Sequence, residues 1–551
     1  MKSVFIIGII VSVAFLSSLF YIQNHHSESK EDLSLFSWES FAKDGKYSWN
    51  GQELLKKKFP TYQHLPLRYD DVEKKPVDMI ELNILDAAIG MYLITGNQHY
   101  LNEASSIADE IEKSMINDSF VLLEVPRKNM VPLTTNREAL NHIAKLALLD
   151  SSKTELVKKL ADSLLKYSID NNTNLFYDST LYNGAPALTT MNFPYGGDVY
   201  LESLLKSYQV TKDEKYLNQV KKTILAYWNL RDKTTNLLPS KLNATNNEIT
   251  EAFMQQYGSG LFLKILLHYY YLTDDQEILN IIDLYSNAIS KYVWNEKTWN
   301  YRTNYDGTVR SSQIEANFPK LDDALFLVYD LNRTKYQDLY NKAKMDYDNT
   351  FQNDLIQTEN GLVTHSVMND GSKASMESRL SYAFTSIQNS AFRLFKDTQD
   401  KSYLDQVEHF YNNAIKHHKR EYGYVNGINA YTLDADSYHR EIYVLMPGAI
   451  ANKLLLKILP SPEVDITWTI IGNHKIPVPF FTTFYDTGYF NAVHFDLNNK
   501  EITLDFVNGE GTITFESKIK NVLMDGKEYD DFEENVLNTI SGDHRYKVRL
   551  T

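Results

Sequence analysis

Apolar residues recur from about residue 35 to residue 459 at the three- and four-residue spacing of helices that bury one face. The clearest case is Asn192–Tyr208, where a glycine-rich loop leads to Asp198 and then to apolar residues at helical spacing. A more polar helix follows after a short turn. The chain repeats this order of loop, apolar helix, turn and polar helix several times, which predicts a helix-pair repeat.

Seven segments read as helices that are apolar on more than one face, and a more charged helix lies between most of them. The apolar helices are predicted over 79–95, 136–149, 195–210, 251–271, 315–331, 376–396 and 437–458. The charged helices are predicted over 98–115, 153–168, 213–230, 275–293, 334–349 and 400–418, and Leu35–Phe59 can supply one more. Connecting turns such as LITGNQHYLNEA and QVTKDEKYLNQV are alike, and the repeat spans about 55–65 residues.

Helix pairs of this kind either stack into an open solenoid or close into a ring. Solenoid repeats are shorter, about 34–47 residues, and more uniform. Here long loops precede the apolar helices, and in a closed ring they would gather at one mouth, where long loops are usually functional. The sequence therefore predicts a mainly α fold, an (α/α)6-7 toroid over 35–460, with an (α/α)7 barrel favoured. The loops are 169–193, 232–250, 294–314 and 351–375.

After Pro460 the period changes from helical to alternating. Short Thr-, Val-, Ile- and Phe-rich runs are separated by turn signals such as Gly472-Asn473 and Asn498-Asn499. This pattern predicts a small β-sandwich domain over 461–551 that packs against the toroid, with carbohydrate binding as the alternative role. Strands are predicted over 464–471, 476–484, 490–496, 501–506, 511–516 and 546–550.

The chain begins with an apolar run over 4–22, after a single Lys2, that is long enough to span a bilayer. Residues 1–23 are therefore predicted to be an N-terminal membrane anchor, with a cleaved signal as the second choice, and 24–34 a polar tether. The remainder is expected to lie outside the cytoplasm, either membrane-anchored or secreted.

The amino-acid composition argues against several kinds of partner and of chemistry. The formal net charge of −15 argues against nucleic acid as a partner. The absence of cysteine excludes disulfides, thiolate zinc sites and cysteine nucleophiles. No histidine spacing indicates a metal site. The 38 tyrosines suit stacking on sugar rings as well as packing. A monomer is expected.

Polar residues gather at the expected N-terminal ends of the apolar helices, where a toroid keeps its pocket. Carboxylates at such positions also cap helices and complement the helix dipole. Their recurrence at helix after helix favours a shared pocket. The candidate catalytic carboxylates are Glu81, Asp198, Glu251, Glu315 and Glu377. The candidate substrate-binding residues are Arg137, Asn192, Tyr195, Gln255, Asn317, Arg379, Tyr438 and His439.

Converging carboxylates suit glycoside hydrolysis, in which one protonated acid donates to the leaving oxygen and a second, ionised, activates water or attacks the sugar. Tyr438, His439 and the arginines suit a different reaction. A Tyr or His can remove the C5 proton of a uronic acid while Arg137 or Arg379 neutralises its carboxylate, as in a lyase or a C5-epimerase. Both sets of residues are present in the sequence.

The segment FPYGGDVYLESLLKSYQVTKDEKYL resembles class I α-mannosidases, glycoside hydrolase family 47, in which a glycine-rich loop precedes an acid-bearing helix. The resemblance implies an (α/α)7 barrel, Asp198 as the catalytic aspartate and Glu202 as a second acid. It implies Glu81 as the general acid through IELNILDAAIGMYLITGN. It also implies calcium, although the family's Thr-Glu-Ala-His signature does not occur here; no cofactor is predicted from the residues themselves.

The sequence thus predicts an exported carbohydrate-active protein whose partner is a glycan or polysaccharide, attached to a membrane through 4–22. The simplest activity is a glycoside hydrolase with general acid and base carboxylates. A uronate lyase or glucuronyl C5-epimerase is the first alternative. A non-catalytic surface protein that binds glycan at the toroid mouth is the second.

Overall fold

The structure is a computed structural model, and everything below concerns the residues it describes. The predicted anchor and tether lie outside them. The described ranges are 38–59, 68–70, 72–77, 82–95, 97–113, 115–116, 120–121, 130–181, 184–193, 197–311, 313–315, 320–353, 356–368, 372–380, 386–398, 400–436, 441–443, 468–471, 474–477, 493–496, 501–505, 511–514, 518–534, 536–540 and 544–551.

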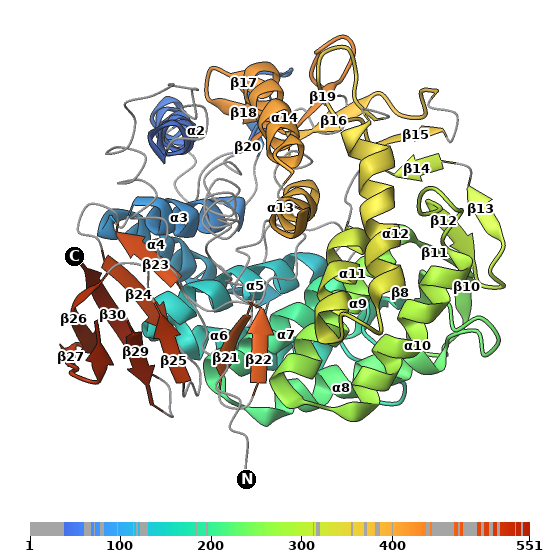
Figure 1. Ribbon diagram of the computed structural model, residues 1–551, viewed down its shortest axis with the longest axis horizontal. Coiled ribbons are helices and arrows are strands. Elements are labelled where there is room, and N and C mark those ends of the chain that lie inside the picture. The colour runs from blue at the N-terminus through green and yellow to red at the C-terminus, as the bar shows by residue number, and fades with distance from the viewer. Residues whose placement is uncertain are drawn as a thin grey trace.

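Inner and outer helices alternate along the chain and follow one another round the molecule, which is an α/α toroid (Figure 1). The inner helices are α3 (Leu82–Thr95), α5 (Leu133–Leu149), α7 (Gly197–Thr211), α9 (Gln256–Thr273), α11 (Lys320–Leu331) and α13 (Ser386–Thr398). The outer helices are α2 (Trp38–Lys58), α4 (Gln98–Lys113), α6 (Thr154–Tyr167), α8 (Glu214–Asn229), α10 (Gln276–Tyr292), α12 (Gln337–Tyr347) and α14 (Ser402–His418). Within these ranges, no helix is both long enough and apolar enough to cross a membrane.

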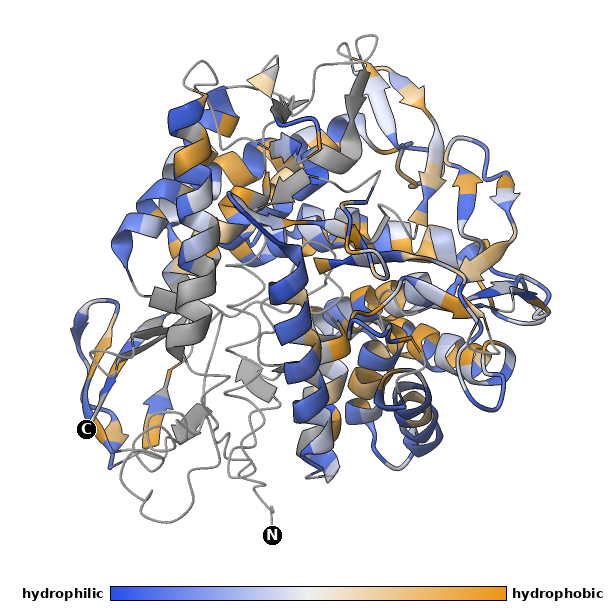
Figure 2. Ribbon diagram, turned by 90° about the horizontal axis from the view of Figure 1, so that it is seen from above, coloured by the Kyte–Doolittle hydropathy of each residue, from blue (hydrophilic) through white to orange (hydrophobic). Residues whose placement is uncertain are grey.

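The two kinds of helix differ in how much of their surface is buried. Residues 253–269, which include most of α9, are all buried, so this inner helix is covered on every side. The outer helix α10 buries one stripe, which includes Ile278, Ile281, Ile282 and Tyr285. Its other side is polar, and Figure 2 shows this mixture of hydrophobic and hydrophilic residues on the helices. A helix with one apolar face therefore lies in the outer layer, and a helix with several apolar faces lies in the inner layer.

The similar turn sequences between inner and outer helices share one hydrogen-bonding device. After α7, the Thr211 hydroxyl accepts the Asp213 backbone N–H at 3.2 Å, and the Asp213 carboxylate accepts the Lys215 N–H at 3.1 Å as the cap of α8. Thr273 and Asp275 repeat both contacts before α10. The Thr-x-Asp spacing thus ends one helix and starts the next.

Short strands in the long loops form a crown at one mouth of the ring. The strand before an inner helix pairs antiparallel with a strand of the following long loop. These pairs are β5 (Met130–Pro132) with β6 (Ser179–Leu181), β8 (Thr190–Asn192) with β9 (Lys241–Asn243), β11 (Phe253–Gln255) with β12 (Arg302–Asn304), β14 (Gln313–Glu315) with β15 (Ser366–Met368), and β16 (Glu377–Arg379) with β19 (Gly427–Asn429). The remaining strands of the toroid loops are β2 (Lys75–Val77), β3 (Met115–Ile116), β4 (Phe120–Val121), β7 (Pro186–Leu188), β10 (Ile249–Glu251), β13 (Val309–Ser311), β17 (Lys419–Arg420) and β18 (Gly423–Val425).

The last loop returns to the first and closes the ring. Strand β20 (Glu441–Tyr443) pairs with β18 and also with β1 (Arg68–Asp70), which lies between α2 and α3. At the same seam Gly51 of α2 lies so close to the Tyr422 carbonyl that a Cβ would overlap it. The predicted toroid is therefore confirmed, and a sheet that joins both ends of the helical region distinguishes it from an open solenoid.

Several predicted helix starts were wrong. Glu251, Glu315 and Glu377 lie on strands β10, β14 and β16, and the helices begin later, at Gln256, Lys320 and Ser386. Residues 441–443, inside the helix predicted over 437–458, form strand β20, and the rest of that segment lies outside the described residues. Three-residue strands are too short to show an alternating pattern, and their hydrogen bonds come from a distant loop.

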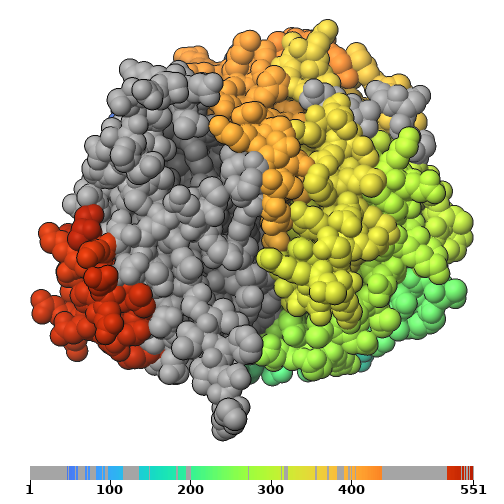
Figure 3. Space-filling model, viewed as in Figure 1, coloured from blue at the N-terminus to red at the C-terminus, as the bar shows by residue number. Residues whose placement is uncertain are grey.

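The C-terminal region contains small antiparallel sheets, as predicted, and β26 and β29 are strands that the pattern did not predict. The C-terminal sheet strands lie together at one edge of the molecule (Figure 1), and residues 518–551 form one cluster there (Figure 3). A separate hairpin, β21 (Trp468–Ile471) with β22 (His474–Pro477), contacts α9. One sheet has the order β23 (Val493–Asp496), β24 (Glu501–Asp505), β30 (Arg545–Leu550), β26 (Ile519–Met524), β27 (Lys527–Glu528); the other has β25 (Gly511–Thr514), β29 (Val536–Thr539), β28 (Phe532–Glu533).

Candidate functional site

A cavity of about 430 Å³ opens among the crown strands next to the N-terminus of α9. Its walls come from two neighbouring sheets, because β8 and β10 belong to one three-stranded sheet and β11, β12 and β13 to the next. Three residues predicted from the sequence, Asn192, Glu251 and Gln255, meet here. The full lining is Asn192, Thr250, Glu251, Ala252, Phe253, Gln255, Arg302 and Arg310.

Glu251 is a predicted catalytic carboxylate that lines this cavity. Its side chain is 41% exposed, so a ligand can reach it. One carboxylate oxygen accepts the Ser240 hydroxyl at 3.2 Å, and the other lies 3.8 Å from the Lys241 ammonium. Because Glu251 lies on β10 and not in the first turn of α9, it is not a helix cap. Helix capping therefore does not explain why an acidic residue occurs at this position.

Two arginines in the cavity were not among the predicted residues. Arg302 on β12 and Arg310 on β13 lie over the ring of Phe253, with guanidinium carbons 5.5 and 4.1 Å from its centroid. Arg302 also donates to the Tyr301 hydroxyl at 3.4 Å. Among the described residues, no carboxylate lies within ion-pair distance of either guanidinium. The sequence signal was weak, since a lone arginine in a loop usually faces solvent.

Asp178 is a second carboxyl near this wall. It precedes β6, and its carboxyl accepts the backbone N–H of Asn192, which lines the cavity. Burial raises the pKa of Asp178, and the charges of Arg137 and Lys241 oppose that shift only in part. Asp178 therefore keeps its proton to a higher pH than an ordinary aspartate does. Its place in the long loop 169–193 was the signal that could have identified it.

The other predicted residues divide into three groups. Arg137 is 1% exposed, its guanidinium carbon lies 6.0 and 5.9 Å from the centroids of the stacked Phe176 and Tyr200 rings, and it does not line the cavity. Glu377 and Arg379 form an ion pair at 2.5 Å on β16. Asp198 lies in the first turn of α7 and Glu315 on β14, but their side chains are not described, and Glu81, Tyr195, Asn317, Tyr438 and His439 lie outside the described residues.

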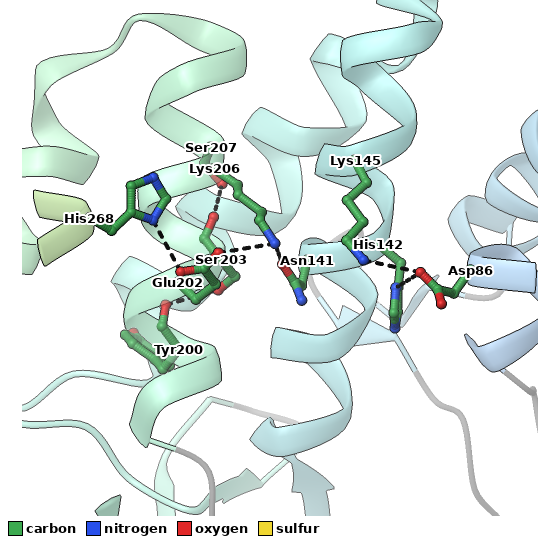
Figure 4. Close-up of polar contacts among 10 residues, drawn as sticks. All are labelled: Asp86, Asn141, His142, Lys145, Tyr200, Glu202, Ser203, Lys206, Ser207 and His268. Carbon is green, nitrogen blue, oxygen red and sulfur yellow. Dashed lines mark hydrogen bonds and ion pairs between the residues drawn. The ribbon is translucent and has the colours of Figure 1, made fainter. Parts of the chain in front are cut away.

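Below the mouth, buried polar side chains link neighbouring inner helices (Figure 4). Lys145 of α5 contacts the Asp86 carboxylate of α3 at 3.1 Å, and the His142 ring lies 3.5 Å from the same oxygen. Lys206 of α7 donates to Asn141 of α5 at 2.8 Å. We call the whole set the polar belt; its members are Asp86, Asn141, His142, Lys145, Glu202, Lys206, Lys264, His268, Asp323, Asp330 and Arg393.

The polar belt continues through the later helices. Glu202 of α7 lies 3.0 Å from Lys206 and 3.2 Å from the ring of His268 on α9. Lys264 of α9 pairs with Asp323 of α11, and Asp330 of α11 binds Arg393 of α13 through two bonds of 2.5 and 2.6 Å. Each described inner helix is thereby joined to the next.

Glu202, which the resemblance matched to a second acid, is 1% exposed and belongs to the polar belt. Burial alone would raise its pKa, but Lys206 and His268 outweigh burial and hold the pKa of Glu202 below its ordinary value. In the described part of the structure, Glu202 is thus an ionised partner of neighbouring helices and does not line the cavity.

Among the described residues, nothing identifies a site for the calcium that the resemblance implies. The Thr-Glu-Ala-His sequence is absent from the chain. Among the described residues, no group of three or more His, Asp or Glu side chains is arranged to hold a metal ion.

Comparison with family models and with curated sequences finds no match. Solved structures do match. An α-1,2-mannosidase from Trichoderma reesei superposes with a TM-score of 0.58 at 13% identity, over 76% of this chain and 93% of that one. A cellobiose 2-epimerase from Bacillus thermoamylovorans gives 0.50 at 15%, over 66% and 99%. One from Spirochaeta thermophila gives 0.50 at 12%, over 64% and 98%.

These similarities define the class of protein by its fold. The chain is an α/α toroid of the architecture used by sugar hydrolases and sugar epimerases. The resemblance to class I α-mannosidases that the sequence predicts is confirmed at this level. Identities this low establish the architecture alone, so the activity has to be argued from the cavity.

Proposed function

We propose that this protein is a carbohydrate-active enzyme, most simply a glycoside hydrolase, that works in the cavity beside Glu251. The observation that carries the proposal is an accessible carboxylate, fixed by Ser240 and Lys241, in a cavity of about 430 Å³ at the crown. That volume falls in the range of small-molecule sites. The match in fold to a mannosidase and to sugar epimerases adds support without deciding the reaction.

In this proposal Glu251 is the ionised carboxylate that activates water or attacks the sugar carbon. Lys241 and Ser240 fix the direction of its carboxylate. Asp178 supplies the proton to the leaving oxygen, because its raised pKa suits a general acid. The amides of Asn192 and Gln255 orient sugar hydroxyls. A separation of about 5–5.5 Å between the two carboxyls would favour retention, and about 6.5–9.5 Å inversion.

We also propose where in the cell the enzyme works. The apolar run 4–22 would hold the enzyme at a membrane with the toroid outside the cytoplasm, where it meets extracellular glycans. The C-terminal sheets then contribute packing or a second contact with the polymer.

The test compares the full-length protein with Glu251→Gln, which keeps the shape of the side chain and removes its charge. Glu248→Gln is the matched control, because Glu248 is exposed on the same hairpin and does not line the cavity. Neutral and uronic-acid glycans are incubated with each, and three signals are read: new reducing ends, absorbance of unsaturated products, and solvent deuterium at C5.

We expect reducing ends from the parent protein and from the control, and a loss of about 10²–10⁴-fold in Glu251→Gln, the usual contribution of acid–base catalysis. Unsaturated product or deuterium would replace the proposal by a lyase or an epimerase. Binding without any turnover would identify a glycan-binding protein, and full activity in Glu251→Gln would remove the cavity from the chemistry.

A further inference from the structure

Arg302 and Arg310 lack the carboxylate partner that three other described arginines have. Arg393 is bound by Asp330 through two bonds, Arg379 by Glu377 at 2.5 Å, and Arg333 lies 3.6 Å from Asp330. The two cavity arginines have no such carboxylate among the described residues. The Nε of Arg302 is buried and has no hydrogen-bond partner there. A partly buried guanidinium normally acquires a counter-charge, because desolvation without one is costly.

Both guanidinium groups are held in place without being neutralised. The guanidinium carbons of Arg310 and Arg302 lie 4.1 and 5.5 Å from the centroid of the Phe253 ring, which β11 carries. Cation–π contact orients a guanidinium and leaves its N–H edges available.

The charge balance of the cavity is opposite to that of the molecule. Arg302 and Arg310 face one carboxylate, Glu251, and that carboxylate already has Lys241 at 3.8 Å. The whole chain carries a formal charge of −15. A local positive site on an acidic protein selects for anionic ligands, because the surrounding charge disfavours nonspecific anion binding.

We propose that the cavity binds an anionic substituent of a glycan, with Arg302 and Arg310 as its recognition residues. A carboxylate, sulfate or phosphate ester can accept paired hydrogen bonds from guanidinium edges, which a neutral hydroxymethyl group cannot do. The identity of the ligand as a glycan rests on the function proposed above; the preference for an anion rests on the two arginines alone.

The experiment measures binding of the full-length protein to matched oligosaccharides by calorimetry. Each pair differs in one substituent: a uronate, a sulfate ester or a phosphate ester against the neutral sugar. The variants are Arg302→Gln and Arg310→Gln. Arg333→Gln is the control, because it removes the same charge from an arginine that also lies over an aromatic ring, at the opposite end of α11. Thermal unfolding of each variant checks that it is folded.

We expect one anionic ligand to bind at least about tenfold more tightly than its neutral partner, and each cavity variant to remove most of that preference. Arg302→Lys should give an intermediate value, since it keeps the charge and loses the paired geometry. Added salt should weaken anion binding and leave neutral binding unchanged. The ligand with the largest preference identifies the substituent.

Two results would overturn the inference while leaving the proposed function intact: equal binding of neutral and anionic partners, or a preference that persists in both cavity variants. Failure of every glycan to bind would overturn both proposals. Loss of binding in Arg333→Gln as well would show a general charge effect and would remove the assignment to the cavity.

Discussion

Replacing Lys206 by methionine tests whether the polar belt stabilises the toroid. The Lys206 side chain is fully buried, and its ammonium lies 3.0 Å from Glu202 and 2.8 Å from the Asn141 amide oxygen. Methionine keeps most of the volume and removes the charge. The Glu202 carboxylate, 2% exposed, is then left with the ring of His268 as its remaining partner in the polar belt.

The magnitude follows from the geometry. At 3.0 Å, two unit charges attract by about 5–6 kcal/mol at an effective dielectric constant of about 20. Water that relaxes toward Glu202 and the contact with His268 recover part of this. We therefore expect Lys206→Met to lower the free energy of unfolding by about 3–5 kcal/mol, the usual result of removing one partner of a buried pair.

The matched control is Lys158→Met. Lys158 pairs with Glu155 at 2.7 Å, but the side chains are 41% and 81% exposed, so the loss should be at most about 1 kcal/mol. Urea unfolding followed by circular dichroism gives both values under one condition. The double variant Glu202→Gln with Lys206→Met should lose less than the sum of the single variants, because no unpaired charge remains. Equal losses in Lys206→Met and Lys158→Met would refute the reasoning.

Two further predictions concern the ring seam and a buried carboxyl pair. Gly51→Ala should lower the unfolding temperature, because its Cβ would overlap the Tyr422 carbonyl, even though alanine is favoured over glycine in helices by about 1 kcal/mol. Asn50→Ala, at an exposed position of α2, is the control. A higher unfolding temperature for Gly51→Ala would contradict the prediction, because it would mean that the chain at the seam moves to accept the methyl group. Asp322 and Asp346 both accept hydrogen bonds from Trp299, and burial raises the pKa of each carboxyl. The free energy of unfolding that these two groups contribute should therefore be greatest at acidic pH and fall as the pH rises through their raised pKa values. Asp322→Asn, which imitates the protonated form, should flatten that dependence in thermal unfolding measured against pH, and an unchanged slope would contradict the assignment.

The helix layers were predictable because their physical signal is local. An outer helix such as α10 has one apolar stripe, and an inner helix such as α9 carries apolar residues on several faces, so the pattern of apolar positions identifies both. The strands of the crown were not predictable in the same way. β10 and β14 are three residues long and owe their existence to partners in other parts of the chain.

The site was predictable only in part for the same reason. Glu251, Asn192 and Gln255 were predicted because each lies near the start of an inner helix, although Glu251 and Gln255 were expected inside the helix and lie on strands before it. Arg302 and Arg310 come after an outer helix, on strands that reach the cavity only through pairing with β11. No pattern within their own loop indicates that neighbour.

The most direct test of the central claim is a crystal structure of Glu251→Gln with a glycan that the parent protein converts. We expect sugar density in the cavity, with the scissile bond beside residue 251 and an anionic substituent on Arg302 and Arg310. Sugar bound elsewhere on the toroid, with this cavity empty, would contradict it.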